Sequence, residues 1–259
     1  MAGPDSPPRV PLALKLALAP LLLAQAVHTR RRLPRLPEAS GAREGAVGQG
    51  AELGLLILGD SSAAGVGVDT QDDALAGCLS RALARHAGRR VRWRLVARSG
   101  VTSAGALALL DEQPPRPAEL AVVVTGVNDV IDQVAPRRAL PARTALMRAL
   151  RERSGVRHAV FTPLPPMHRF AGLPQPLRWV VGRDAFAHGR ALALWAQTQR
   201  DASLVQMDLP LDPAMLAADG FHPGAPVYRL WGDALAAHIV RHVLPQPEFA
   251  SQTLTGETG

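Results

Sequence analysis

The chain has 259 residues, of which 47% are hydrophobic and 20% charged, so it can bury a large core and is neither disordered nor collagen-like. Its single cysteine, Cys78, excludes an intramolecular disulfide framework and a metal site made of cysteines alone. The formal net charge is +7, but Lys15 is the one lysine among 29 basic residues, and only 4% of all residues are aromatic. We interpret this arginine-rich charge as a coding bias and expect no nucleic-acid partner, because aromatic stacking platforms are scarce.

An apolar run covers residues 10–27 and is followed at once by three arginines at positions 30–32. The run is short for a membrane-spanning helix, and Lys15 interrupts it. A signal peptide with its cleavage site at residues 24–26, or an apolar helix packed on the domain, is also compatible with this pattern. Because positive charge on this flank tends to stay cytoplasmic, we favour a peripheral helix that contacts a membrane surface through residues 10–32 from the cytoplasmic side. Export through the signal peptide is the alternative location.

The rest of the chain divides into three parts by composition. Residues 33–50 are rich in proline and glycine and are expected to form a linker, so residues 1–50 comprise the apolar helix, its basic flank and this linker. Residues 51–245 are expected to form one domain. The polar segment 246–259 is expected to be a disordered tail.

Short apolar runs alternate with longer helical patterns through this domain. Strands are expected at residues 53–58, 91–96, 120–124, 157–161 and 204–207. Helices are expected at about residues 73–87, 103–111, 137–153, 183–200 and 226–243. The alternation predicts an α/β fold in which helices cover both faces of a parallel sheet of about five strands. Ligands of such sheets bind beyond the carboxyl ends of the strands, so the loops that begin there deserve the closest inspection.

Two of these loops carry residues suited to acyl-transfer chemistry. Ser61 follows the first strand in the sequence Gly59-Asp60-Ser61, where its hydroxyl would stand at the top of the sheet beside the free amides at the start of a helix. Gly100 follows the second strand and can present a bare backbone amide to a ligand. A helix-capping serine and an ordinary turn glycine would look the same at each position taken alone.

Two further loops complete the pattern. Asn128 follows the third strand and is a neutral donor that can stabilise an oxyanion, although an Asx turn is the common alternative. Asp219 and His222 lie three residues apart in a late loop, where the carboxylate can orient the imidazole and leave its other nitrogen free as a base. A solvated loop histidine is the alternative for His222.

Taken together, these blocks resemble the GDSL-type lipase/esterase group, the SGNH hydrolase superfamily, over roughly residues 53–243. The blocks are Gly59-Asp60-Ser61, Gly100, Gly126-Val127-Asn128-Asp129 and Asp219-Gly220-Phe221-His222-Pro223. The resemblance implies a flavodoxin-like three-layer α/β/α sandwich and the hydrolysis of an ester or thioester without a metal or organic cofactor. Ser62 stands where the name of the group expects leucine, a position that does not take part in the chemistry.

The resemblance also implies a role for each residue. Ser61 would be the nucleophile, His222 its general base and Asp219 the partner of His222. The oxyanion would be bound by the amides of Ser61 and Gly100 and the side chain of Asn128. Gly59, Asp60, Gly126 and Asp129 would support the loops.

The substrate is suggested by a long proline-rich segment at residues 162–181, because long loops beside an active site often bind substrate. Its large apolar side chains are expected either to line an acyl pocket or to cover the edge of the core; they are Met167, Phe170, Leu173, Leu177 and Trp179. Together with the apolar N-terminal helix, they favour acyl-chain or lipid esters. An acyltransferase, a carbohydrate O-acetylesterase and a non-catalytic membrane-associated protein of this fold are the alternatives.

Overall fold

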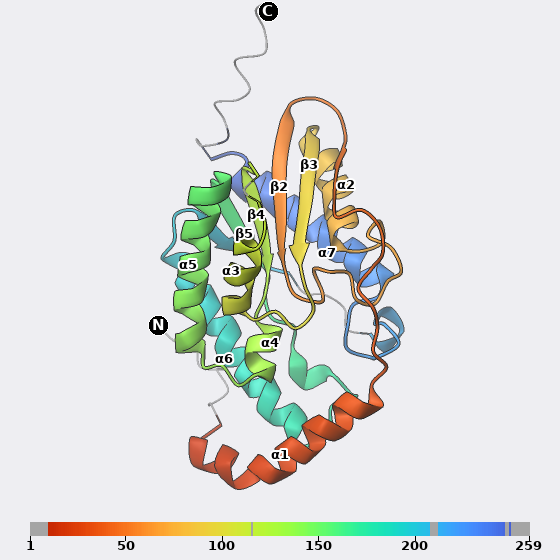
Figure 1. The fold of residues 1–259 in the computed structure, drawn as a ribbon, viewed down its shortest axis with the longest axis vertical. Helices are drawn as coiled ribbons and strands as arrows, with labels where there is room; N and C mark the ends of the chain where they lie inside the picture. Colours follow the sequence, from red (N-terminus) through yellow and green to blue (C-terminus); the bar gives the residue numbers. More distant parts are fainter. Residues whose placement is uncertain (1–9, 115, 208–211, 247–248, 250–259) are drawn as a thin grey trace, which may run out of the picture.

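The computed structural model describes residues 10–114, 116–207, 212–246 and 249. These residues form one six-stranded sheet with helices on both faces (Figure 1). The strands are β1 (Glu44–Val47), β2 (Glu52–Gly59), β3 (Arg90–Ala97), β4 (Leu120–Val124), β5 (His158–Phe161) and β6 (Ala202–Leu204). The longer helices are α1 (Leu12–Arg32), α2 (Leu75–Ala87), α3 (Ser103–Asp111), α4 (Val127–Ile131), α5 (Pro136–Ser154), α6 (Leu177–Gln197) and α7 (Ala225–His238). Two 3₁₀ turns (Met167–Arg169 and Pro213–Met215) and a π-helical turn (Ile239–Val243) complete the assignment.

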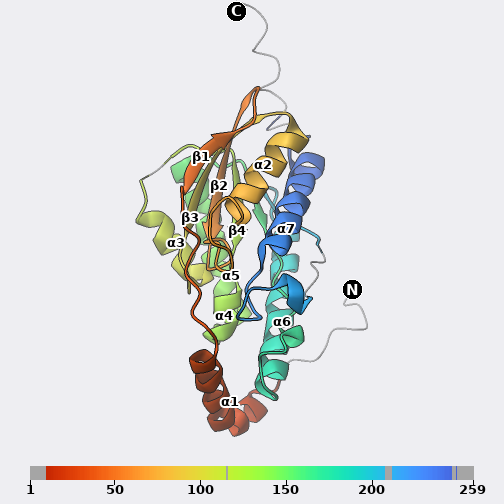
Figure 2. The same ribbon diagram turned by 90° about the vertical axis from the view of Figure 1, so that its right-hand side faces the viewer.

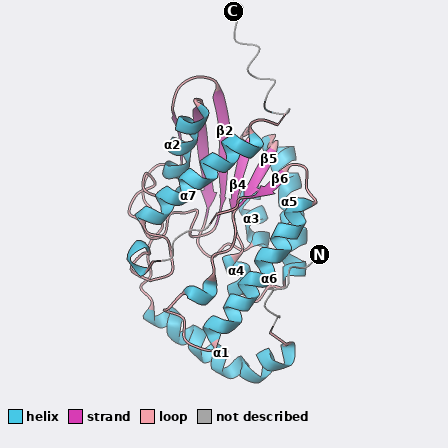
Figure 3. Cartoon of the chain, turned by 180° about the vertical axis from the view of Figure 1, so that it is seen from behind, coloured by secondary structure: helices cyan, strands magenta, loops and turns pink. Residues whose placement is uncertain are grey.

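The sheet has the order β1-β3-β2-β4-β5-β6, and every pairing is parallel except that of β1 with β3. Helices α2 and α7 pack on one face against β2 residues such as Leu53 and Leu55. Helices α3, α5 and α6 pack on the other face, against Leu56 and Leu58 of the same strand. Alternate side chains of β2 therefore pack into two separate cores, one on each face of the sheet. The sheet is the middle of three layers (Figure 3).

The predicted flavodoxin-like α/β/α sandwich is confirmed, with one strand more than expected. Strand order reverses between β2 and β4, the position at which such sheets bind their ligands. The added strand, β1, lies within residues 33–50, so the linker expected there is wrong for residues 44–47. It escaped prediction because it is a four-residue edge strand with almost no buried side chain and therefore no alternating pattern.

Several element boundaries also differ from those expected. Helix α6 begins at Leu177 rather than at residue 183, and β6 ends at Leu204, where a strand was expected to begin. Part of the predicted tail, residues 247–248 and 250–259, lies outside the described residues. Phe249 is buried in the core beside α7, so the tail prediction is wrong at this residue.

Helix α1 lies apart from the sandwich, across the amino-terminal part of α6 (Figure 2). Figure 1 places it at the end of the molecule toward which the carboxyl ends of β2 and β3 point. Thr29 is the one residue of this helix that is buried, and by length and composition the helix is long and apolar enough to cross a membrane. The predicted apolar helix with a basic flank is thus present, with Arg30, Arg31 and Arg32 in its last turn.

Candidate active site

The structure brings Ser61, His222 and Asp219 into one hydrogen-bonded chain, although 161 positions separate the serine from the histidine. The Oγ atom of Ser61 lies 2.9 Å from Nε2 of His222. The other ring nitrogen, Nδ1, lies 2.5 Å from Oδ2 of Asp219. Since Nδ1 carries the ring proton and donates a hydrogen bond to the carboxylate, Nε2 is left unprotonated and can accept the hydroxyl proton of Ser61.

The Asp219 carboxylate is held by its own loop. Its Oδ1 atom accepts hydrogen bonds from the amides of Phe221 and His222, both at 2.9 Å. Burial alone would raise the pKa of Asp219, but the hydrogen bonds from His222 and Phe221 outweigh it and hold this pKa below the ordinary aspartate value. Asp219 is therefore a fixed anion beneath the imidazole.

Ser61 lies in a series of turns rather than at the start of a helix. Strand β2 ends at Gly59, residues 61–67 form turns, and the next helix, α2, begins only at Leu75. The prediction that a helix begins beside Ser61 and directs its dipole at the hydroxyl is therefore wrong. The local amides are oriented instead by a short turn in which Ala64 donates to the carbonyl of Asp60 and Val66 to that of Ser61.

The three expected oxyanion donors lie in segments that follow the neighbouring strands β2, β3 and β4. Within the described residues, the amides of Ser61 and Gly100 donate no hydrogen bond, which leaves both for a ligand. Gly100 has a φ of +83°, a conformation that strongly favours glycine, and it is exposed. Asn128 donates one hydrogen of Nδ2 to the carbonyl of Val101 at 3.0 Å, so the second hydrogen of this amide is available.

Asp60, which precedes Ser61, and Asp129, which follows Asn128, are both buried but differ in their hydrogen-bond partners. Asp60 accepts a hydrogen bond from the amide of Ser62, and burial raises its pKa to about 7. Asp129 accepts from the amide and the hydroxyl of Ser103, the first residue of α3. Gly126, with a φ of +128°, precedes α4, the short helix that carries Asn128 and Asp129.

An apolar cavity of about 130 Å³ adjoins this chain of residues. It is lined by Asp60 and Ser62, on either side of Ser61, and by Phe221 and Pro223, on either side of His222. Most of the remaining wall is apolar and comes from the ends of β4 and β5, the following loops and α7; it includes Val124, Val127, Leu164, Phe170, Met207, Leu216, Val227 and Trp231. A cavity of this composition suits the apolar part of a small ligand.

Of the side chains expected to line an acyl pocket, Phe170 alone lines this cavity. Met167 is buried behind it in a small core with Val130 and Val181, and Leu173 and Leu177 pack at the edge of that core. Trp179 lies on α6 with its ring 5.5 Å from the guanidinium of Arg183. These four side chains therefore do not line this cavity: Met167 belongs to the small core, and Leu173 and Leu177 cover its edge.

Sequence reasoning missed most of the wall because it is assembled from distant segments. Leu164 lies in the segment that was inspected, but Val227 and Trp231 belong to α7, whose helical pattern predicts only a buried face. The carbonyl of Val101 was missed for another reason, since a backbone acceptor leaves no trace in side-chain identity. No signal in the sequence would have found it.

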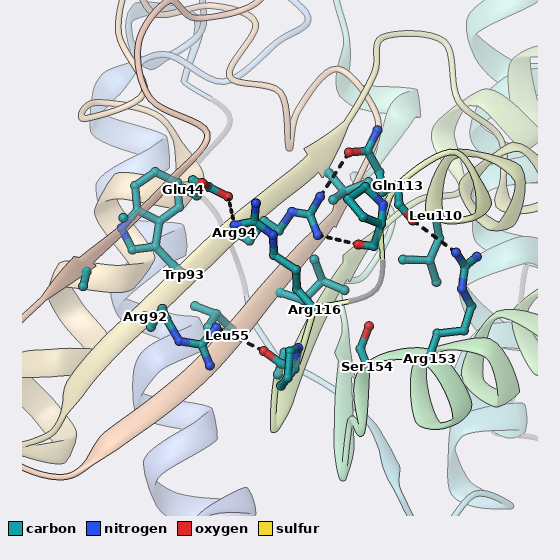
Figure 4. A pocket seen from close by; sticks show the side chains of 17 residues that line it. Glu44, Leu55, Arg92, Trp93, Arg94, Leu110, Gln113, Arg116, Arg153 and Ser154 are labelled. Atoms are coloured by element: carbon teal, nitrogen blue, oxygen red, sulfur yellow. Dashed lines mark hydrogen bonds and ion pairs between the residues drawn. The ribbon is translucent and has the colours of Figure 1, made fainter.

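A larger cavity, of about 360 Å³, lies elsewhere and contains none of the expected site residues (Figure 4). It is formed by β1, β3 and the segment that joins α3 to β4. Its arginines are engaged within the protein: Arg94 with the side chain of Gln113, and Arg116 with Glu44. In the part of the chain that the structure describes, no group of three or more His, Cys, Asp or Glu side chains could hold a metal ion.

Comparison with known proteins identifies the family of the chain. The sequence model of the GDSL-like Lipase/Acylhydrolase family matches residues 57–230. The GDSL-like esterase Rv1075c of Mycobacterium tuberculosis is 29% identical over 243 residues, which cover 83% of this chain and 74% of that protein.

Solved structures show the same likeness. The structure of TesA superposes with a TM-score of 0.56 and 26% identity, covering 72% of this chain and 97% of that one. The psychrotrophic esterase EstA from Pseudoalteromonas sp., solved with monoethylphosphonate as inhibitor, shares the fold with a TM-score of 0.53 and 17% identity, covering 72% of this chain and 96% of its own.

Proposed function

Since the chain belongs to the GDSL-like lipase/acylhydrolase family, and with it to the carboxylic ester hydrolases, we propose that it is a serine esterase that acts through an acyl-enzyme on Ser61. One observation carries this proposal. It is the continuous chain of short contacts from Ser61 Oγ to His222 Nε2, and from His222 Nδ1 to Asp219 Oδ2. A neutral serine hydroxyl is a weak nucleophile near pH 7, and this arrangement supplies the base that it needs.

In the first half of the reaction, His222 removes the proton of Ser61 while Oγ attacks the ester carbonyl carbon. The negative charge that develops on the carbonyl oxygen is met by the amides of Ser61 and Gly100 and by the free hydrogen on Asn128 Nδ2. Asp219 stabilises the imidazolium that forms. His222 then donates its proton to the leaving alcohol, and the acyl group remains on Ser61.

In the second half, a water molecule takes the place of the alcohol. His222 removes a proton from the water, which attacks the acyl-enzyme, and the same three donors stabilise the second oxyanion. The proton returns to Ser61 Oγ as the carboxylic acid leaves. An acceptor alcohol in place of water would make the same site an acyltransferase, so product analysis with added alcohol separates the two outcomes.

We predict that Ser61→Ala and His222→Ala each lower the turnover of a p-nitrophenyl ester by about 10⁴-fold or more, because catalytic triad members act as a unit. The control is Ser62→Ala, which removes the neighbouring hydroxyl and is expected to retain most activity. Circular dichroism should show unchanged folding in all three variants. Turnover similar to that of the unmodified protein in Ser61→Ala would contradict the mechanism.

The cavity supports acyl-chain esters as the substrate class. Its wall includes the sequence neighbours of Ser61 and of His222, and a mainly apolar wall gains more from an alkyl chain than from an acetyl group. An esterase specific for acetyl groups would have little use for this volume. The acyl-chain length that the cavity accepts can be measured directly with a series of esters.

The polarity of α1 supports contact with a membrane surface through residues 10–32. Its polar side chains point to the protein: Lys15 Nζ binds Asp184 at 2.5 Å, and Gln25 bonds the backbone at residues 175 and 177. Its leucines point outward, with Leu12, Leu16 and Leu23 between 65% and 71% exposed. An apolar surface flanked by Arg30, Arg31 and Arg32 suits an anionic lipid surface, and the basic flank favours the cytoplasmic side.

A further inference from the structure

Helix α5 carries an arginine where its pattern calls for an apolar residue. Arg143 belongs to the buried stripe of this helix together with Ala139, Leu146, Met147 and Leu150. Its side chain is 0% exposed, and none of its three guanidinium nitrogens has a hydrogen-bond partner among the described residues. Burial lowers the pKa of Arg143. A cation in such a place is unfavourable by itself, so its presence needs a reason.

The nearest countercharge is Asp129, whose Oδ2 lies 3.7 Å from Nη2 of Arg143. Asp129 directly follows Asn128 in the chain, and its side chain is 1% exposed. Its oxygens accept the amide of Ser103 at 3.2 Å and the hydroxyl of Ser103 at 2.5 Å. Asp129 is thus held from one side by Ser103 and faces the Arg143 guanidinium on the other, where a buried cation needs a partner.

Two contacts therefore join the segment that carries Asn128 (residues 126–131, the Asn128 loop) to the segment before α3 (residues 98–102, the Gly100 loop). Asn128 Nδ2 is bound to the carbonyl of Val101, and two residues further along, Ser103 is bound to Asp129. The first contact fixes the plane of the Asn128 amide. The second fixes the start of α3, and with it the loop that presents the amide of Gly100.

Arg143 also packs directly on the start of the Asn128 loop. A Cβ atom added to Gly126 would lie 3.2 Å from Nη2 of Arg143 and 2.9 Å from Cδ1 of Leu164. The guanidinium and the leucine thus fill the space behind the backbone that leads into α4. Any change in the size or charge at position 143 would be transmitted to Asn128 through this backbone.

We propose that Arg143 is a positioning residue for the esterase reaction: through Asp129 it fixes Asn128 and the Gly100 loop in the geometry that stabilises the oxyanion. The inference rests on the proposed function, since it assigns Arg143 a role at the same site. Arg143 touches no substrate and takes no part in proton transfer.

The first test compares Arg143→Met with Arg148→Met, a matched change at an exposed position of the same helix. Because a misplaced donor typically costs about 10²-fold, we expect Arg143→Met to lower kcat by about 10- to 100-fold while KM stays close to its original value. Arg148→Met should leave both constants unchanged. Arg143→Lys keeps the charge and should recover a large part of kcat. An Arg143→Met enzyme with unchanged kcat would overturn the proposal.

The decisive test is a double-mutant cycle with Asn128→Ala. If Arg143 acts through Asn128, Arg143→Met should add little to the loss that Asn128→Ala already causes, whereas independent effects would multiply. Multiplying losses overturn the positioning role. Should Arg143→Met fail to fold, the charge-neutral pair Arg143→Met/Asp129→Asn replaces it in the same cycle. Unchanged kcat in Asn128→Ala alone would instead count against the oxyanion role in the proposed function, so the two failures are distinguishable.

Discussion

At the scale of single residues, the site depends on how each charge is surrounded. Asp219 and Asp60 are both buried beside the reacting pair, but three hydrogen bonds from its own loop and His222 keep Asp219 charged. Asp60 accepts backbone hydrogen bonds from Ser62 and Ala63, but its complete burial outweighs them and raises its pKa. The same residue type thus has a raised pKa in one place and a lowered pKa in the other, because burial dominates at Asp60 and hydrogen bonds dominate at Asp219.

A pH-dependent stability change follows for Asp60. Its pKa is about 7 in the folded protein against an ordinary value of 3.8, so the folded state favours the protonated form. As pH rises from about 4 to about 7, the unfolded chain ionises first and the stabilisation is lost. The Asp60→Asn variant cannot ionise at this position, so it does not lose stability in this pH range. Its side-chain carbonyl can still accept the hydrogen bond from the amide of Ser62. Urea unfolding should therefore show Asp60→Asn gaining about 2–4 kcal/mol relative to the unmodified protein between pH 4 and pH 8. A difference that does not change with pH would contradict this assignment.

The proximity of Ser61 and Asn128 could be predicted from sequence, because parallel strands place their carboxyl ends at one edge of the sheet. The loop of Asp219 and His222 was identified by the internal spacing of those two residues. Arg143 could not be found in this way. Its partner lies on another helix, and an arginine within an apolar stripe has no meaning until the packing is known.

At the scale of elements, the loops after β4 and β5 together with α7 build the cavity beside Ser61. The sequence indicated that the segment after β5 is apolar, but not which of its side chains point inward. Phe170 does so, whereas Met167 is turned into the small core beneath α6. Two short elements were missed, since β1 has almost no buried side chain and α4 is little more than one helical turn, so neither shows an apolar pattern.

We expect the cavity to set acyl-chain preference. With p-nitrophenyl esters from acetate to palmitate, kcat/KM should rise beyond acetate, because each buried methylene contributes about 0.8 kcal/mol. Leu216→Trp narrows the cavity from a half-buried position and should move the optimum to shorter chains. Ile131→Trp, at an exposed position that does not line the cavity, is the control. A sharp preference for acetate in the unmodified enzyme would exclude acyl-chain esters as the substrate class.

At the scale of the whole molecule, α1 lies beyond the carboxyl ends of the strands, at the same end of the protein as the loops that carry the site (Figures 1 and 2). The exposed leucines of α1 therefore belong to this end. An esterase held to a lipid surface by this end would meet substrates that leave the bilayer. The sequence predicted the helix and its basic flank. It could not predict how the helix docks, because that depends on Asp184 and on the backbone near residue 175.

Vesicle binding tests this orientation. The full chain should sediment with vesicles that contain anionic phosphatidylglycerol, and Leu16→Ser/Leu23→Ser should weaken binding by about tenfold or more, since two exposed leucines are removed from the contact. Added salt should also weaken binding by screening the three arginines of the last turn. Leu230→Ser, at an exposed leucine of α7, is the matched control. Equal binding by all variants would exclude α1 as the contact.

The most direct test of the account is covalent labelling of the full chain with a fluorophosphonate, followed by mass analysis of the modified peptide. The proposed mechanism requires one adduct per chain, located on Ser61, because only this hydroxyl is bonded to the imidazole of His222 among the described residues. Labelling should disappear in Ser61→Ala and persist in Ser62→Ala. An adduct on another residue, or none on a folded protein that hydrolyses esters, would contradict the assignment of Ser61 as the nucleophile.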